Sequence, residues 1–219
     1  MQINYKINNH NHKIYIKRDI LKNIYNDLVN LETDRKILFI YDPNIEKKFI
    51  KKIKDNLKIL NNKFYLMPLK GLKSSKNEKV LFKIINFLIN EEFTKKSVII
   101  SCCGGVIGDL SGLAASLYLR GLYYFHIPTT MTSIVDSCIG GKTAINYRNI
   151  INSIGTYYHP KSVFISEEII SSMPEREYLA GIPEIAKCGL IHKNNIFKTL
   201  LEKDVDVKKK KFKVVANLV

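Results

Sequence analysis

Residues 97–109, SVIISCCGGVIGD, decide the fold class of this 219-residue chain. Their apolar run predicts a strand buried on both faces, and Gly104 and Gly105 separate it from a helix expected to begin near Gly108 and Asp109. Glycines at such a junction let backbone N–H groups approach a phosphate, which the helix N-terminus also attracts. Cys103 stands where the first glycine of a complete G-x-G-x-x-G motif would be, so a purely structural turn stays open as an alternative.

The chain on both sides of this stretch alternates between strand and helix patterns. Helices are predicted near residues 19–31, 44–57, 77–90 and 108–119. Strands are predicted at residues 3–7, 13–17, 36–42, 64–68, 97–103, 123–127 and 162–165. This order is typical of an α/β, Rossmann-like fold, with a mainly parallel sheet and helices on both faces.

The pattern changes at Pro174. Residues 175–191, 195–202 and 207 onward are predicted to be helical, and proline followed by acidic residues suits a helix start. We therefore expect an α/β domain at residues 1–173 and the start of an incomplete all-α domain at residues 174–219.

Composition limits the functional classes. The net charge is +15, but only five of the 35 basic residues are arginine and the lysines are scattered, which argues against a nucleic-acid partner. The N-terminus lacks a signal peptide, and no apolar run approaches the roughly 18–20 residues of a membrane span. These features predict a soluble, cytoplasmic protein with no membrane partner.

The four cysteines show no C-x-x-C spacing. Cys102 and Cys103 are neighbours in a predicted strand, so their side chains should point to opposite faces of the sheet. We expect buried free thiols rather than a metal or redox site.

Two further segments carry ligand-binding side chains. Thr129 and Thr130 follow a predicted strand, where open α/β sheets bind ligands, although capping threonines are the alternative. In residues 134–146, Asp136 and Lys142 flank two glycines; Lys142 can hold a phosphate or carboxylate, and Asp136 can accept from a hydroxyl. This segment is not a kinase-type phosphate loop, because Asp136 stands at the position of its first glycine.

Residues 173–189, MPEREYLAGIPEIAKCG, are predicted to form one helix with Glu177, Glu184 and Lys187 near one face. A solvated stripe of ion pairs is one interpretation. A carboxylate among apolar neighbours also suits a paired or metal-bound site.

Taken together, four phrases resemble the 3-dehydroquinate synthases of the sugar phosphate cyclase superfamily: GGVIGDLSGLAASLYLRG from Gly104, IPTTMTSIVDSCIGGKTAIN from Ile127, SIGTYYHPKSV from Ser153 and MPEREYLAGIPEIAKCGLI from Met173. The resemblance implies bound NAD, a divalent metal (zinc or cobalt) and a small phosphorylated sugar-acid substrate. The implied reaction converts 3-deoxy-D-arabino-heptulosonate 7-phosphate to 3-dehydroquinate and phosphate in the shikimate pathway, which leads to the aromatic amino acids.

The resemblance also implies roles for single residues. Lys142 and Asn152 would bind the substrate phosphate, Lys187 the substrate, and Arg120 the phosphate across a dimer interface; with Asp136 beside nicotinamide, these are the catalytic candidates. Glu184 would be the carboxylate metal ligand. The implied NAD-binding residues are Asp42, Lys76, Gly104, Gly105, Val106, Ile107, Gly108, Asp109, Thr129, Thr130, Lys142 and Ser172.

The chain departs from the family pattern in three places. Cys103 replaces a glycine and should crowd the turn, Ile151 replaces a cofactor-contacting lysine, and residues 71–76 lack an acid, all of which imply weaker NAD binding. The family's two histidine metal ligands come from a domain beyond residue 219, so the metal site should be incomplete in this chain. The five histidines here are expected to be structural or solvated: His10, His12, His126, His159 and His192.

Several readings stay open. A homodimer and a separate C-terminal polypeptide are partners that the resemblance allows. The alternatives are a truncated, non-catalytic remnant that binds at most NAD or a partner, another NAD-dependent sugar phosphate cyclase, and a metal-dependent polyol dehydrogenase. Lys142, Asn152 and Arg120 favour a phosphorylated substrate over the dehydrogenase.

Overall fold

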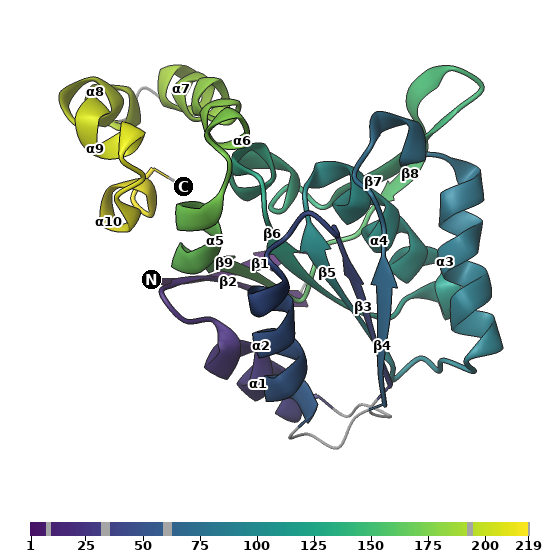
Figure 1. Cartoon of the computed structure of the whole chain (residues 1–219). Helices are drawn as coiled ribbons and strands as arrows, with labels where there is room; N and C mark the ends of the chain where they lie inside the picture. The colour runs from purple at the N-terminus through teal and green to yellow at the C-terminus, as the bar shows by residue number, and fades with distance from the viewer. Residues whose placement is uncertain (8–9, 32–35, 59–62, 192–194, 219) are drawn as a thin grey trace.

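A computed structural model describes residues 1–7, 10–31, 36–58, 63–191 and 195–218 and shows a seven-stranded sheet between two layers of helices (Figure 1). The strands of this sheet are β1 Gln2–Ile7, β2 His10–Lys17, β3 Lys36–Tyr41, β4 Lys63–Pro68, β5 Val98–Cys103, β6 Tyr123–Pro128 and β9 Ser162–Ser166. Their order is β1-β2-β9-β6-β5-β3-β4, parallel throughout except for β1, which pairs antiparallel with β2 at one edge. The seven predicted strands and the α/β fold class are confirmed.

Helices cover both faces because the central strands are mostly apolar and are buried along nearly their whole length. In β3, Ile37 and Phe39 join the core under α1 (Leu21–Val29), α2 (Lys47–Lys58) and α5 (Glu167–Ser172). Leu38 and Ile40 join a second core under α3 (Glu78–Asn90) and α4 (Gly105–Leu117). Alternate side chains of a strand point to opposite faces, so a continuous apolar run requires two cores.

The same alternation separates the neighbouring cysteines. Cys102 lies in the core with α1 and α2, and Cys103 lies in the core with α3 and α4. Both are fully buried free thiols, and burial raises the pKa of each. The predicted opposite orientation is confirmed.

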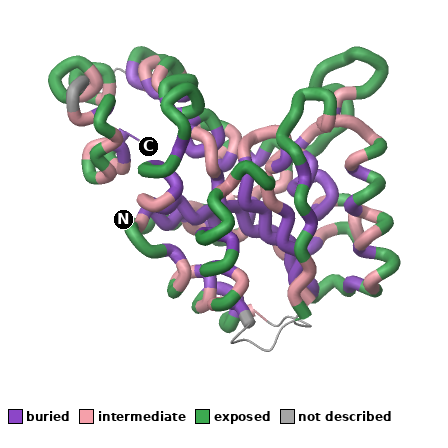
Figure 2. The backbone as a smooth tube through the Cα atoms, in the orientation of Figure 1, coloured by how far each residue is buried: buried purple, intermediate pink, exposed green. Residues whose placement is uncertain are grey.

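Two elements were not predicted from the sequence: α5 and a hairpin of β7 (Lys142–Tyr147) and β8 (Ile150–Tyr157), which forms its own two-stranded sheet. Arg148 and Asn149 both have positive φ, as a two-residue hairpin turn of type I′ requires. The hairpin projects from the sheet at the upper right of Figure 1, and its outer part is exposed in Figure 2. Because every residue of β8 is exposed, no alternation of buried and exposed positions marks it as a strand.

Residues after Pro174 are helical as predicted, but the expected single helix over residues 175–191 is two helices. These are α6 (Glu175–Leu179) and α7 (Ile182–Ile191), and Glu177 therefore lies on a different helix from Glu184 and Lys187. The helix is interrupted near Gly181, where a Cβ would lie 2.5 Å from Met131 Cγ. The remaining helices are α8 (Ile196–Glu202), α9 (Asp204–Lys208) and α10 (Phe212–Val215).

These C-terminal helices pack on the α/β layer. Tyr178, Val207 and Val215 are buried in the core that α1 and α2 cover, and the Tyr178 hydroxyl donates to the Val207 carbonyl at 2.7 Å. The domain boundary at residue 173 stays a prediction. In the part of the chain that the structure describes, no helix is long and apolar enough to cross a membrane. The cytoplasmic location also stays a prediction.

Candidate functional site

The glycine turn connects β5 to α4. Gly104 is extended, and the first intrahelical bond runs from Gly108 N to Gly104 O at 3.0 Å, so α4 begins at Gly105, three residues before its predicted start. The backbone N–H groups of Gly105, Val106 and Ile107 therefore belong to the first helical turn, whose N–H groups have no partner within a helix. Such an N-terminus fits one phosphate of a dinucleotide.

Cys103 does not crowd this turn as expected. Its side chain is directed into the core with Ile107 and Leu110 of α4. The close approach is instead at Gly104, where a Cβ would lie 3.0 Å from Thr130 Cγ2. Glycine at position 104 therefore keeps the turn and the threonine loop adjacent.

Thr129 and Thr130 follow β6, the strand beside β5. Thr129 N donates to Cys103 O at 3.0 Å, which holds the threonine loop against the end of β5. Thr130 Oγ1 accepts from Ser133 N at 3.2 Å at the start of η3 (Ser133–Ser137), a π-helix that carries Asp136. π-helical turns are rare and occur frequently at functional sites.

Asp42 follows β3, the other neighbour of β5. Its carboxylate accepts from Asn44 N at 2.9 Å and from Gly71 N at 3.2 Å. The strand order reverses between β3 and β5, because β4 lies on one side of β3 and all later parallel strands lie on the other. Asp42 and Gly104 thus flank the switch point, where open α/β sheets bind nucleotides.

A cavity of about 720 Å³ opens beside the turn, between α4, η3 and the hairpin. Four predicted site residues line it: Asp109, Asp136, Lys142 and Asn152. Residues that sequence reasoning missed complete the wall: Ser137, Gly140, Thr143, Ala144, Ser153, Gly155, Thr156 and Tyr157. Most of these belong to the hairpin, so recognising its two-residue turn would have identified them.

Lys76 connects the two sides of this cavity. It follows η1 (Lys73–Ser75), and its Nζ lies 2.5 Å from Asp109 Oδ2 and 2.5 Å from Asn152 Oδ1. Asn146 donates its N–H to the Lys76 carbonyl at 2.9 Å and accepts from Asn152 N at 3.0 Å. Lys76 therefore joins α4 to β8. Asn152 makes its contact with Lys76 from a left-handed backbone conformation, with a φ of 54°.

Asp109 is the most perturbed carboxyl group in the cavity. Burial raises its pKa, and Asp136 adds to the rise, whereas the hydrogen bond and charge of Lys76 lower it. The net shift is upward. Asp109 and Lys76 are also largely enclosed, with 18% and 13% of their side chains exposed.

Glu184 and Lys187 form an ion pair on α7 but do not line the cavity. The hydrogen bond to Glu184 is the main cause that raises the pKa of Lys187, and Asp136 contributes. Since Asp136 acts on Lys187 and Gly181 packs on Met131 after the threonine pair, α7 lies near the cavity's edge.

The described residues do not form a metal centre. Within residues 1–7, 10–31, 36–58, 63–191 and 195–218, no group of three His, Cys, Asp or Glu side chains can hold an ion. A catalytic zinc site usually takes three protein ligands, so Glu184 supplies one at most.

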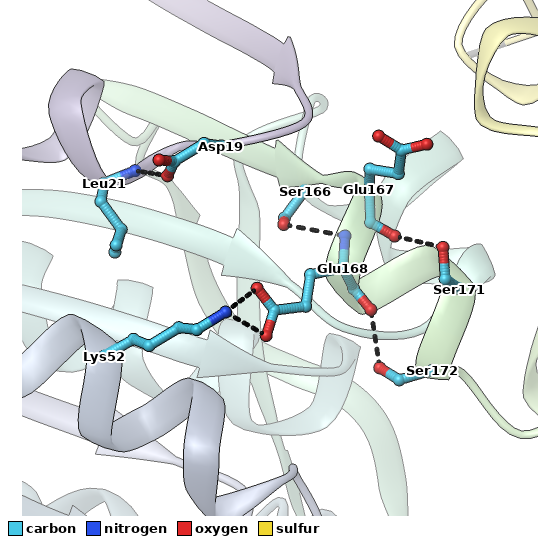
Figure 3. A network of polar contacts seen from close by, with 8 residues as sticks. All are labelled: Asp19, Leu21, Lys52, Ser166, Glu167, Glu168, Ser171 and Ser172. Carbon is cyan, nitrogen blue, oxygen red and sulfur yellow. Dashed lines mark hydrogen bonds and ion pairs between the residues drawn. The ribbon is translucent and has the colours of Figure 1, made fainter.

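Arg120 and Ser172 lie away from the cavity, and their roles stay predictions. Arg120 is exposed at the end of η2 (Tyr118–Arg120), beyond the far end of α4, which spans about 20 Å at 1.5 Å per residue. Ser172 ends α5, where its hydroxyl donates to Glu168 O at 2.8 Å (Figure 3). This network holds the Lys52–Glu168 ion pair, with N–O distances of 2.7 and 2.8 Å.

The described histidines differ in environment. His10 is exposed, whereas His126 is buried between Ser101 Oγ at 2.5 Å and Ser133 Oγ at 3.3 Å, and burial lowers its pKa to about 3. His12 Nδ1 donates to Pro160 O at 2.9 Å, and His159 packs on Gly141. His192 lies outside the described residues.

A family model described as 3-dehydroquinate synthase N-terminal matches residues 66–180. The 3-dehydroquinate synthase of Prochlorococcus marinus subsp. pastoris is 37% identical over 196 residues, which cover 89% of this chain and 54% of that protein. The chain thus spans about half the length of the curated relatives it matches.

Solved structures share the fold. The 2-epi-5-epi-valiolone synthase from Streptomyces hygroscopicus subsp. jinggangensis, solved with NAD+ and Zn2+, has a TM-score of 0.83 at 24% identity, covering 95% of this chain and 59% of that one. A 2-deoxy-scyllo-inosose synthase complexed with carbaglucose-6-phosphate, NAD+ and Co2+ has a TM-score of 0.78 at 22% identity, covering 85% and 50%.

Proposed function

The chain belongs to the 3-dehydroquinate synthase family, and from this membership we propose that it forms the dinucleotide- and phosphate-binding part of such an enzyme. The reaction would convert 3-deoxy-D-arabino-heptulosonate 7-phosphate to 3-dehydroquinate and phosphate in the shikimate pathway. One observation carries the proposal: Asp109, Asp136, Lys142 and Asn152, which come from four different elements, line a single cavity beside a glycine turn.

NAD is the proposed dinucleotide. Its pyrophosphate would lie on the N–H groups of Gly105, Val106 and Ile107, and Asp42 at the end of β3 would accept from a ribose hydroxyl. Gly104, Gly108, Thr129 and Thr130 would lie beside the dinucleotide, and Asp109 and Lys76 would pair next to it. The solved cyclases of the same fold, which contain bound NAD+, support this assignment.

The phosphorylated substrate would occupy the hairpin side of the cavity. Lys142 offers an ammonium group and Asn152 an amide, which together suit a phosphate, while Asp136 can accept from a substrate hydroxyl. Lys76 already binds Asn152, so the amide is held in place before the substrate arrives. The carbaglucose-6-phosphate complex of a related fold supports a sugar phosphate in this place.

NAD in this proposal would supply hydride transfer, which oxidises a substrate hydroxyl to a ketone and later reverses that oxidation. The ketone would make the adjacent C–H of the substrate acidic enough for phosphate to leave. The protein's own part is positional and electrostatic. Lys142 would hold the charge of the departing phosphate, and the ion pair of Lys76 with Asp109 would fix the opposite side of the cavity.

The metal does not fit the described residues alone, so no step is derived through it. Glu184 is the proposed carboxylate ligand, and the others would come from residues outside the described part or from a separate C-terminal polypeptide. In a complete enzyme, Glu184→Ala should abolish metal-dependent turnover and leave NAD affinity largely unchanged. Unchanged metal content in that variant would disprove the ligand assignment.

A homodimer would explain the position of Arg120. This residue is exposed at the end of η2 and does not line the cavity of its own chain. Its exposed position allows it to enter the site of a second copy, as the family resemblance implies.

Calorimetric titration of the chain with NAD, followed by a phosphate-release assay with the heptulosonate phosphate, tests the proposal. Binding and release together support it, whereas absence of NAD binding in both the wild-type chain and the Ile151→Lys variant would overturn it. NAD binding without release, even with added metal, favours the non-catalytic alternative, which the missing three-ligand cluster in the described residues supports. Release from a different sugar phosphate alone would identify another cyclase, and oxidation of a polyol would identify a dehydrogenase.

A further inference from the structure

A stack of rings lies beneath the turn that presents Lys142. Tyr5 on β1 stacks on His12 on β2, with ring centroids 5.3 Å apart and planes at 23°. His12 in turn contacts His159, which follows β8, at 5.5 Å between centroids and with the planes tilted at 57°. The stack therefore links the antiparallel edge of the sheet to the hairpin side of the cavity.

The ring of His159 covers Gly141, the residue before Lys142. A Cβ on Gly141 would lie 2.5–2.6 Å from three atoms of the ring, so the imidazole rests directly on the glycine backbone. Gly141 has a φ of +64°, a conformation that glycine adopts without strain. On its other side, the Gly141 carbonyl accepts from Tyr158 N at 2.7 Å. The turn is thus held between a ring and a backbone hydrogen bond from adjacent residues.

The surroundings of His159 favour the neutral ring. Burial lowers its pKa and the neighbouring His12 lowers it further, while the Ile139 carbonyl acts in the opposite direction. His159 Nδ1 is buried without a hydrogen-bond partner in the described part of the chain. Two titratable groups beside the stack are Tyr5, whose pKa burial raises to about 12, and Cys138, whose pKa burial also raises, so both are uncharged near neutral pH.

We propose that His159 is a positioning residue for Lys142: its imidazole, backed by His12 and Tyr5, holds the Gly141 turn so that Lys142 enters the cavity in one orientation. The inference rests on the proposed role of Lys142 in binding the substrate phosphate. It adds a residue that touches neither cofactor nor substrate. A chain of packed rings would then determine how well the phosphate is anchored.

The packing of His159 on the Gly141 turn should depend on pH, and the lowered pKa of His159 gives the direction of that dependence. A group whose pKa in the folded state lies below the unfolded value of about 6.5 stabilises the fold above that value. This contribution is lost as pH falls through the folded pKa, because a charged His159 then lies beside His12 in a partly desolvated stack. The turn should therefore loosen on acidification.

Amide hydrogen exchange of Tyr158, and the ¹⁵N shifts of Gly141 and Lys142, report on the turn directly. In His159→Ala we expect exchange of the Tyr158 amide to be about tenfold faster at neutral pH, because the turn opens locally without the ring. His159→Phe keeps a ring on Gly141 and should restore slow exchange. In the wild type the ¹⁵N shifts should titrate with the His159 ring signal below pH of about 6.5, and in His159→Phe that titration should vanish.

His10→Ala is the matched control, since His10 is an exposed histidine on β2 outside the stack. It should leave the exchange of Tyr158 and the titration unchanged. Equal exchange in wild type and His159→Ala, or titration that persists in His159→Phe, would overturn the inference.

Affinity for inorganic phosphate separates this inference from the proposed function. Both His159→Ala and Lys142→Ala should weaken phosphate binding by about tenfold, a typical loss for one charge-assisted contact. If the turn responds to His159 but Lys142→Ala binds phosphate as the wild type does, the positioning of the turn stands and the proposed role of Lys142 fails. If Lys142→Ala weakens binding and His159→Ala does not, the inference about His159 fails instead.

Discussion

The two walls of the cavity are built differently. The glycine-turn wall rises from β5 and α4, where Ile100, Ile107 and Leu110 are fully buried. The opposite wall is the hairpin, whose strand β8 is exposed throughout, with Ile151 76% and Tyr157 72% exposed. A site for a large constant cofactor can rest on the core, whereas contacts to a smaller substrate are often carried by exposed segments on a rigid scaffold.

The hairpin is nevertheless fixed at specific points. Thr143 of β7 packs on α4 at Gly112, where a Cβ would lie 2.5 Å from Thr143 Cγ2, and Ile145 is buried in the core with α3 and α4. Its outer strand depends on the pairing with β7, on Lys76 and on the turn beneath His159. Substitutions in the buried core should therefore mainly lower stability, whereas substitutions in the hairpin should mainly lower ligand affinity.

The largest contrast should appear in stability. Phe39→Ala in β3 should lower the free energy of unfolding by about 3–5 kcal/mol, because Phe39 is fully buried and packs against Tyr41 and Phe64. Ile151→Ala in β8 should change it by less than about 0.5 kcal/mol. Urea denaturation measures both, and similar losses in the two variants would show that the hairpin is part of the core.

Acid should lower the stability of the fold through His126, which is buried on β6 beneath the glycine-turn wall. Burial holds the pKa of His126 at about 3, so the unfolded chain binds a proton below about pH 6.5 that the folded chain does not. Stability from this group is present above that pH and falls by about 1.4 kcal/mol per unit on acidification, or roughly 3 kcal/mol between pH 6.5 and 4.5.

The His126→Gln variant isolates this term. It should be less stable at neutral pH, since the contacts to Ser101 and Ser133 change, but its pH dependence should be shallower by about that slope. Parallel pH curves for the two proteins, measured by urea denaturation, would mean that His126 has the same pKa in the folded and the unfolded chain.

Ligand affinity should divide between the walls. Gly104→Val should weaken NAD binding by about tenfold or more, because a side chain there meets Thr130 beside the turn. Asn152→Ala should leave NAD affinity within about twofold, since Asn152 lies on the hairpin side of the cavity. Calorimetry with NAD tests both variants, and an equal loss in the two would place the dinucleotide across the hairpin.

The smallest effect concerns the link between the walls. Lys76→Met removes the ammonium group between Asp109 and Asn152, which should cost about 1 kcal/mol of stability. The pKa of Asp109 should rise further, because Lys76 is the influence that lowers it. Carboxyl titration by NMR measures this shift. Lys79→Met, an exposed lysine on α3, is the matched control, and an unchanged Asp109 pKa in Lys76→Met would contradict the ion pair.

The sequence predicted the residues of the glycine-turn wall more completely than those of the hairpin wall. Gly104, Asp109 and Thr130 follow strands with strong apolar runs, and the structure places all three at the same edge of the sheet. Asn152 was assigned through resemblance alone, and Lys142 was identified only from the glycines and Asp136 beside it, because no pattern predicted the strands on which they lie. Arg120 and Ser172, also assigned through resemblance, do not line the cavity.

The amino-acid sequence by itself determined the seven-stranded sheet, its two helical layers and the glycine turn. These features follow from local regularities: apolar runs of strand length, helical spacing, and glycine where the backbone must come close to another group. Cys102 and Cys103 occupy opposite cores for the same reason, since neighbouring side chains in a strand alternate.

Only the tertiary structure decided the hairpin, the break at Gly181, the start of α4 at Gly105 and the union of Lys76 with Asp109 and Asn152. Apart from the hairpin, these features involve contacts between residues distant in sequence: Met131 against Gly181, Thr130 against Gly104, and Lys76 across 76 positions to Asn152. Such contacts leave no periodic signal in the chain, because the packing of whole elements determines them.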